Sequence, residues 1–144
     1  MAAGTSGLAA SISERSVLLR CRAAGRRLAG LAAGLEAGGG NPLWRLTGGR
    51  PVEPFRHYPA GDCYDQASHA QFYYHSHRDG EFGHIHLFQR PRGMPRGLRP
   101  AMATPDPDAP CHLIAVGLDQ RGEARRLFTT NRWVTDETWL PADR

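Results

Sequence analysis

The most informative segment of the sequence is residues 73–88, which read YYHSHRDGEFGHIHLF. Residues rich in aromatic and β-branched side chains lie on both sides of a turn signal, Asp79-Gly80, and this is typical of two strands joined by a hairpin. A link this short joins antiparallel neighbours, because a parallel crossover needs about a dozen residues or more. The segment therefore predicts an antiparallel hairpin.

Four of the seven histidines of the chain lie in this hairpin. Residues two apart on a strand point to the same face, and a turn closed around Asp79-Gly80 pairs odd positions with even ones. One face therefore receives four imidazoles, together with Tyr73 and Phe88. The four histidines are His75, His77, His84 and His86. The other face receives the candidate core residues Phe72, Tyr74, Ile85 and Leu87.

The rest of the chain after residue 55 has the same strand-like character. A second turn signal, Asp119-Gln120-Arg121-Gly122, predicts another tight hairpin. Short links throughout predict one antiparallel sheet of about five strands within residues 55–140. The expected strands are Arg56–Asp65, Ala70–His77, Gly83–Arg90, Cys111–Leu118 and Glu123–Thr130. Six prolines mark residues 91–110 as a loop, either a functional lid or a disordered excursion.

The N-terminal part predicts an amphipathic helix over residues 11–37. Ser11 and Glu14 have the spacing of a capping box, and the three glycines from Gly38 to Gly40 end the helix. The apolar residues Val17, Cys21, Ala24, Leu28, Leu31 and Leu35 repeat at steps of four and three. We expect a flexible tail over residues 1–10 and a single α+β domain over residues 11–144, with the helix packed on the sheet.

Composition excludes several classes of protein. The chain has 144 residues, of which 40% are hydrophobic and 22% charged, so it is neither wholly disordered nor fibrous. It has no run of 18 apolar residues, so we expect no membrane span. Three separated cysteines without a C-x-x-C pattern argue against a disulfide framework and a cysteine zinc site. Without a recognisable secretory signal, a cytoplasmic location is expected.

The basic residues are all arginine: the chain has 18 of them, no lysine and a net charge of +4. They are spread from Arg15 to Arg144 without a concentrated stripe, so no nucleic-acid partner is expected. Arginine in place of lysine, with much alanine, glycine and proline, is typical of a GC-rich bacterial genome.

The shared face of the hairpin suits a metal ion. Residues two apart on one strand are separated by about 6.6 Å and cross-strand partners by about 4.5–5.5 Å, so inward-tilted imidazoles reach a common ion. The expected cofactor is a divalent transition metal such as Zn, Fe, Ni or Mn. Glu81 or Asp62 would act as acid/base or further ligand, and Arg132 would clamp a small anionic substrate.

Other interpretations stay open for the same residues. His57 could add a ligand or orient one. The four histidines could also form a pocket without metal, bind phosphate, sense pH or serve the structure alone. The leading hypothesis is a histidine-hairpin metal-binding protein, with a small metalloenzyme as its narrower form. The alternative is a non-enzymatic ligand-binding or protein-interaction module with structural histidines, in which the helix stripe allows a homodimer.

Two short motifs resemble known families. His75 and His77, followed by Glu81, resemble the first metal-binding motif of cupins, although the glycine that precedes that motif is missing. His84-Ile85-His86-Leu87 resembles the opening of a histidine-triad motif, in which a histidine is the phosphoryl-transfer nucleophile. Here Phe88 stands in place of the third histidine.

A broader resemblance extends from about residue 57 to residue 141. It is carried by HYPAGDCYD at residues 57–65, YYHSH at 73–77, GHIH at 83–86 and TNRWVT at 130–135. Together these motifs resemble an uncharacterised bacterial family, a domain of unknown function. The resemblance implies no established activity, cofactor or catalytic residue.

Overall fold

The computed structural model of the chain describes residues 5–79, 82–135 and 137–141. The chain divides into two units, residues 1–41 and residues 42–144. The first unit contains one helix and the second contains the sheet. The α+β class predicted from the sequence is thereby confirmed.

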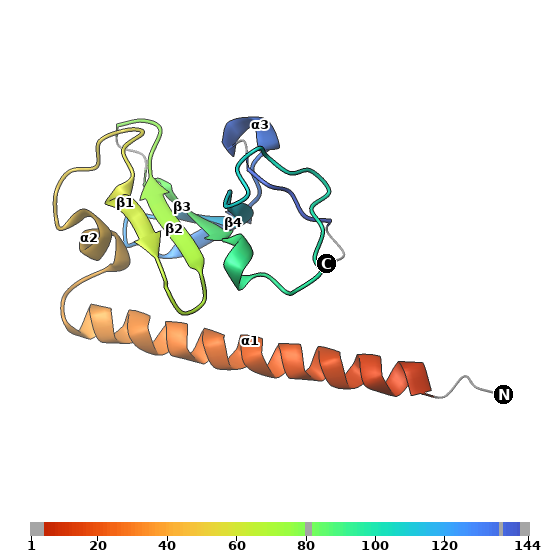
Figure 1. Ribbon diagram of the computed structural model, residues 1–144. Coiled ribbons are helices and arrows are strands. Elements are labelled where there is room, and N and C mark those ends of the chain that lie inside the picture. Colours follow the sequence, from red (N-terminus) through yellow and green to blue (C-terminus); the bar gives the residue numbers. More distant parts are fainter. Residues whose placement is uncertain (1–4, 80–81, 136, 142–144) are drawn as a thin grey trace. The chain divides into compact units, whose positions relative to one another are not determined.

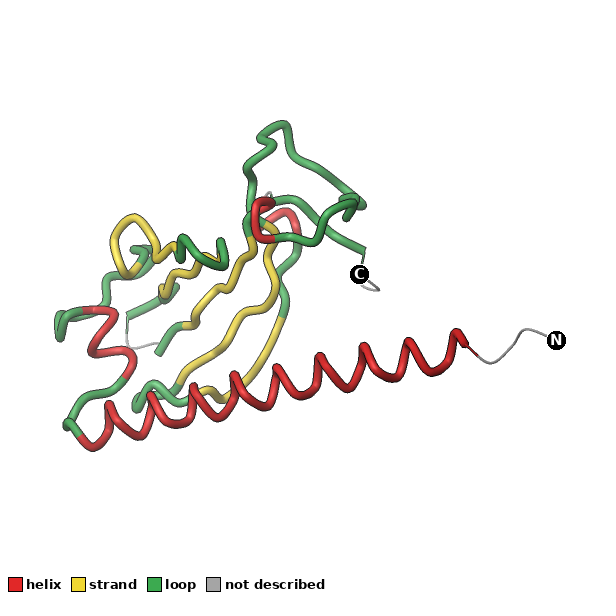
Figure 2. Tube along the Cα trace, turned by 60° about the horizontal axis from the view of Figure 1, so that its bottom comes forward, coloured by secondary structure: helices red, strands yellow, loops and turns green. Residues whose placement is uncertain are grey.

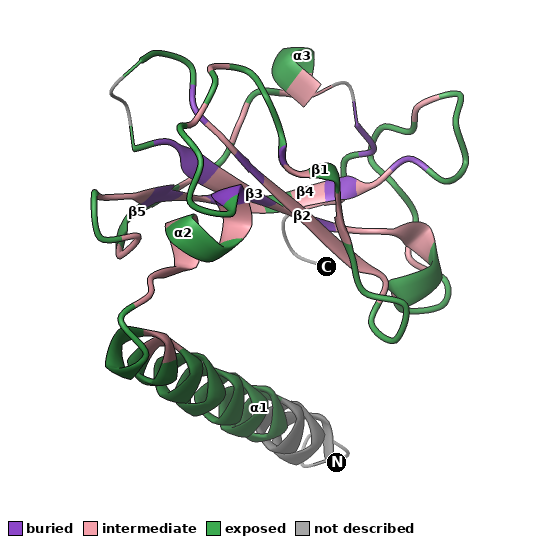
Figure 3. Ribbon diagram, turned by 90° about the vertical axis from the view of Figure 1, so that its left-hand side faces the viewer, coloured by how far each residue is buried: buried purple, intermediate pink, exposed green. Residues whose placement is uncertain are grey.

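The helix of the first unit, α1, extends from Thr5 to Ala37. It begins six residues before the predicted Ser11, so the capping-box pattern does not mark its start. It ends where the glycines predict: Gly39 has a φ of 72°, and the N–H of Gly40 donates to the carbonyl of Leu35 at 2.9 Å. Most of the described part of α1 is exposed (Figure 3). The stripe residues Val17, Leu28 and Leu31 are among its exposed side chains. None of the helices among the described residues has the length and apolar character that a membrane span requires.

The second unit is built on a five-stranded sheet whose neighbouring strands are all antiparallel and follow one another in chain order (Figures 1 and 2). This is the sheet that the short links of the sequence predict. A short helix, α2 (Pro42–Thr47), precedes it and contacts its first strand. The strands are β1 (Tyr58–Tyr64), β2 (Ala70–His75), β3 (His84–Gln89), β4 (Cys111–Leu118) and β5 (Ala124–Phe128).

The register of β2 and β3 confirms the predicted shared face. His75 pairs with His84, and Tyr73 pairs with His86. Gly83 enters β3 with a φ of 66°, and a Cβ there would lie 2.3 Å from the carbonyl oxygen of His75. Only glycine fits so close an approach, and it sets the position of the histidine that follows.

Along β3, the residues on the histidine face are buried and those on the opposite face are half-buried. His84 is 4% exposed and His86 only 2%. On the opposite face, Tyr74 is buried as predicted for a core residue. The other three candidate core residues, Phe72, Ile85 and Leu87, are only half-buried.

The proline-rich loop is held to the C-terminal segment. It begins with a 3₁₀ turn, η1 (Pro91–Gly93), and Met102 forms a β-bridge with Trp139. The N–H of Thr138 donates to the carbonyl of Pro110 at 3.2 Å. A last helical turn, α3 (Arg132–Thr135), follows β5. These contacts place the loop beside the C-terminal segment.

Candidate functional site

A cavity of about 1190 Å³ lies over the histidine face of the sheet. Side chains of the strands form one wall, including all four histidines of the hairpin. The proline-rich loop and the C-terminal segment contribute further lining residues. These are Thr104, Pro105, Asp106, Ala109 and Pro110 from the loop, and Thr130, Val134, Thr135 and Glu137 from the C-terminal segment. The volume lies slightly above the usual range for small-molecule sites, which is about 300–1000 Å³. The imidazoles therefore lie in a space that admits a small molecule.

Three of the four predicted ligands form the tightest group. One nitrogen each from His75, His77 and His84 lies within 4.8 Å of the other two. The Nε2 atoms of His75 and His84 are 2.9 Å apart, and the rings of His75 and His77 are 4.7 Å apart between centroids. His84 is buried, His75 half-buried and His77 exposed. The group therefore extends from the interior of the sheet to its surface.

The spacing of these nitrogens fits a metal ion after small side-chain movements. Two nitrogens bound to one tetrahedral ion at about 2.0–2.1 Å are about 3.3 Å apart. The Nε2 atoms of His75 and His84 would move apart by a few tenths of an ångström from their 2.9 Å separation. The third ring would rotate inward. Three imidazoles of this kind form one of the ligand sets of catalytic zinc sites, in which a fourth position stays open.

His86, the fourth predicted ligand, is differently placed. Its ring lies 4.7 Å from that of His84, but its Nδ1 forms a hydrogen bond with Nε2 of His112 at 3.0 Å. Burial lowers the pKa of His86 to about 3, and positive charge on the neighbouring histidines would lower it in the same direction. Burial also lowers the pKa of His112. This second pair is therefore neutral near pH 7 and borders the three-histidine group.

Asp62 reaches the cavity through an irregularity in β1. The pairing of β1 with β2 shifts between Tyr58 and Cys63, and within this stretch Asp62 has a φ of 59°. Such bulges re-aim side chains. The carboxylate of Asp62 pairs with Nδ1 of His57 at 3.1 Å and accepts from Nε2 of Gln71 at 2.7 Å.

A short relay holds this carboxylate in place. Nε of Arg90 donates to Oε1 of Gln71 at 2.6 Å, which orients the amide toward Asp62. The ring of His57 stacks on Tyr73 with centroids 3.7 Å apart and meets the ring of His75 edge-on at 5.5 Å. The structure thus connects Asp62 to the histidine group through His57, in the orienting position that the sequence left open for that residue.

Tyr73 lies at the centre of the histidine face. Burial raises its pKa to about 12, and the negative charges of Asp62 and Glu137 act in the same direction. The phenol is therefore protonated at any physiological pH. It offers a hydrogen-bond donor to the cavity and does not act as an anionic ligand.

The other two predicted catalytic residues are Glu81 and Arg132. Glu81 lies outside the described residues. Nε of Arg132 donates to the main-chain carbonyl of Glu137 at 3.4 Å, and Arg132 is not among the residues that line the cavity. The arginines that do line it are Arg90 and Arg126. Arg125 and Arg126 are adjacent on β5, and adjacent residues of a strand point to opposite faces. This two-residue period is the sequence signal that could have identified Arg126 as a lining residue.

The sequence interpretation also missed Glu137. This residue lines the cavity and is only 3% exposed. Its Oε1 accepts a hydrogen bond from the Thr135 hydroxyl, and its Oε2 is buried without a hydrogen-bond partner among the described residues. Burial raises the pKa of Glu137. No local pattern signals this position, because only the folding of the C-terminal segment over the sheet buries it.

The fold and the site together define a class: an α+β protein whose antiparallel sheet carries a histidine cluster in a cavity. Residues 22–144 match the model of a protein family, and the chain belongs to that family, which is described as Domain of unknown function (DUF6969). The predicted resemblance to a domain of unknown function is thereby confirmed. A search of the curated proteins found no match, and neither did a search of the solved structures.

Proposed function

We propose that this protein binds one divalent transition metal ion through His75, His77 and His84, and that it acts as a small metalloenzyme on a molecule bound in the adjoining cavity. One observation carries the proposal: a ligand nitrogen from each of the three residues lies within 4.8 Å of the other two, on the wall of a cavity of about 1190 Å³. A histidine cluster with only a structural role would need no adjoining space.

The donor set favours particular metals. Imidazole nitrogen suits Zn, Fe and Ni, whereas Mg and Ca prefer oxygen ligands. Mn binds most weakly of the first-row series and is the least favoured of the four expected metals. Metal binding needs neutral imidazole, and burial keeps the adjacent His86 neutral near pH 7, with a pKa of about 3.

The chain itself supplies groups that hold and move protons beside the three histidines. A bound metal ion would polarise a substrate oxygen or lower the pKa of a bound water. The Asp62 carboxylate pairs with Nδ1 of His57 and so orients the ring of His57 beside that of His75. Glu137 is buried in the cavity wall, and its raised pKa suits a carboxyl group that gives and takes a proton.

Metal analysis of the purified full-length chain tests this proposal. We expect one equivalent of metal per chain after loading with Zn, Fe, Ni or Mn, measured by elemental analysis after removal of free ions. The His75→Ala/His84→Ala variant should lose it. His69→Asn is the matched control, because the ring of His69 pairs with the hydroxyl of Tyr64 at 2.5 Å and does not line the cavity.

Two results would overturn the proposal. One is the absence of stoichiometric binding for all four metals. The other is equal binding by the wild type and the His75→Ala/His84→Ala variant. A thermal shift that a metal produces and a chelator reverses would support the proposal independently, because a ligand that binds only the folded state stabilises it.

A further inference from the structure

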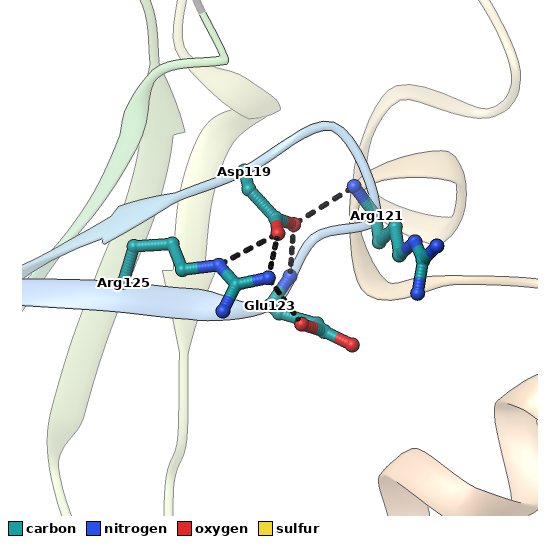
Figure 4. Close-up of polar contacts among 4 residues, drawn as sticks. All are labelled: Asp119, Arg121, Glu123 and Arg125. Carbon is teal, nitrogen blue, oxygen red and sulfur yellow. Dashed lines mark hydrogen bonds and ion pairs between the residues drawn. The ribbon is translucent and has the colours of Figure 1, made fainter.

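The two adjacent arginines of β5 have opposite surroundings. Nη2 of Arg125 lies 2.6 Å from Asp119 and 2.8 Å from Glu123, so two carboxylates neutralise its charge (Figure 4). Arg126 points to the other face of the sheet and lines the cavity. Within residues 5–79, 82–135 and 137–141, no acidic side chain forms an ion pair with it.

Gly117 allows Arg126 to lie over the sheet. In the register of the sheet, Gly117 pairs with His84 on one side and with Arg126 on the other. A Cβ at Gly117 would lie 2.7 Å from Cγ of Arg126 and 3.0 Å from its Nε. The arginine side chain therefore crosses the space that a larger residue would fill, in the direction of the strand that carries His84.

An aromatic ring positions the guanidinium. Cζ of Arg126 lies 5.1 Å from the centroid of the Phe128 ring, within the range of a cation–π contact. The same ring contacts His84 edge-on, with centroids 5.3 Å apart. Phe128 thus lies between the guanidinium and the three-histidine group, and a molecule that spans the two would pack on its ring.

The charges around the cavity favour a carboxylate over a phosphate. The other lining arginine, Arg90, already donates to Gln71 and to the main-chain carbonyl of Asp108. Asp62, Asp106 and Glu137 also line the cavity, so a dianion would meet more repulsion than a monoanion. Much of the wall is apolar, and the rings of Phe88 and Phe128 belong to it.

We infer that Arg126 binds the carboxylate of a small molecule with an apolar or aromatic body, which lies over Phe128 and reaches toward the three histidines. The guanidinium presents two parallel N–H groups that match a carboxylate. This inference deepens the proposed function and rests on it for the position of the ligand's reacting end. The contact with Arg126 itself needs no metal.

Titration of the chelator-treated full-length chain with benzoate tests the inference, with inorganic phosphate as the second probe. Nuclear magnetic resonance of the arginine Nε–H groups follows binding. We expect saturable binding of benzoate with a shift of the Arg126 signal, and weaker binding of phosphate. Arg126→Gln should weaken benzoate binding by about tenfold or more, because a charge-assisted pair is lost. The matched control Arg125→Gln should change it by less than about twofold.

Gly117→Ala gives a second test that leaves the guanidinium in the chain. Its Cβ displaces Arg126, so we expect weaker benzoate binding with the charge unchanged. The inference is overturned if benzoate does not saturate, if Arg125→Gln and Arg126→Gln weaken binding equally, or if phosphate binds as tightly as benzoate.

Measuring metal binding and benzoate binding in the same proteins tests the carboxylate site separately from the proposed metal site. Arg126→Gln should bind zinc with wild-type stoichiometry. If the wild type binds benzoate through Arg126 but no metal, the metal proposal fails and the carboxylate site stands. If the wild type binds zinc but not benzoate, the carboxylate site fails and the metal proposal stands.

Discussion

Nε2 of His75 lies 2.9 Å from Nε2 of His84, directly across the hairpin formed by β2 and β3. The two rings meet at 83°, with centroids 4.6 Å apart. The backbone holds this contact, because His75 and His84 are register partners and the Tyr74 hydroxyl donates to the carbonyl of Phe82 at 2.8 Å. The register of the two strands thus positions two candidate ligands close together, which reduces the entropy lost on binding an ion.

Single substitutions should distinguish a three-histidine site from a four-histidine site. We expect His84→Ala to lower zinc affinity by more than about 100-fold, because loss of an outer-shell partner alone costs about 10–100-fold. His86→Gln should lower it by no more than about tenfold, since Nδ1 of His86 pairs with His112. Competition with a chelating dye measures both affinities. Equal losses in the two variants would show that His86 is a ligand.

Gly83→Ala should destabilise the protein by about 3 kcal/mol or more. The new Cβ would lie 2.3 Å from the carbonyl oxygen of His75 and 2.7 Å from the ring of Tyr74. Gly48→Ala is the control, because Gly48 has a φ of 64°, close to the 66° of Gly83, with no atom within 4 Å of its Cβ position. Urea unfolding measures the stability of both variants. Equal losses of stability would show that backbone strain alone causes the effect at Gly83.

Acid should destabilise the metal-free protein through His86. Its pKa is about 3 in the folded protein, against the ordinary histidine value of 6.5, so the unfolded chain binds the proton more tightly. The contribution of His86 to stability is therefore complete above about pH 6.5. It declines as the pH falls from about 6.5 to about 3 and is lost below that. We expect the free energy of unfolding of the wild type, relative to His86→Gln, to fall by on the order of a few kcal/mol. Urea unfolding in chelator at several pH values measures it, and a difference independent of pH would contradict the prediction.

Glu137 should show the opposite dependence on pH. Burial raises its pKa in the folded state, so the folded protein holds the proton more tightly than the unfolded chain does. Stability from this group is complete below the unfolded pKa and is lost as the pH rises through the folded pKa. Glu137→Gln keeps a neutral acceptor for Thr135. We expect the free energy of unfolding of this variant, relative to that of the wild type, to rise by on the order of 1 kcal/mol when the pH is raised from 4 to 8. Urea unfolding at both pH values checks this, and an unchanged difference would argue against a buried carboxyl with a raised pKa.

The strands and their register could be predicted from the sequence because both depend on neighbours along the chain. The turn signals limited the registers to those that pair odd with even positions, and that alone places His75 and His84 on one face. The structure selects the register in which the two residues are direct partners. The strand period could also have identified Arg126, because it must point opposite to Arg125. The start of α1 was less predictable, since Ser11 and Glu14 are compatible with a helix interior as well as with a cap.

Tertiary structure decided which of these residues share a cavity. The two-residue alternation brought four histidines to one face, but it does not say which face is covered. The proline-rich loop and the C-terminal segment contribute the opposite wall of that cavity, and they bury Glu137 there while leaving Arg132 out of the lining. These contacts join residues far apart in the sequence. Burial depends on everything that surrounds a side chain in the folded protein, and the pKa shifts that burial causes depend on it too. The local sequence therefore does not determine them.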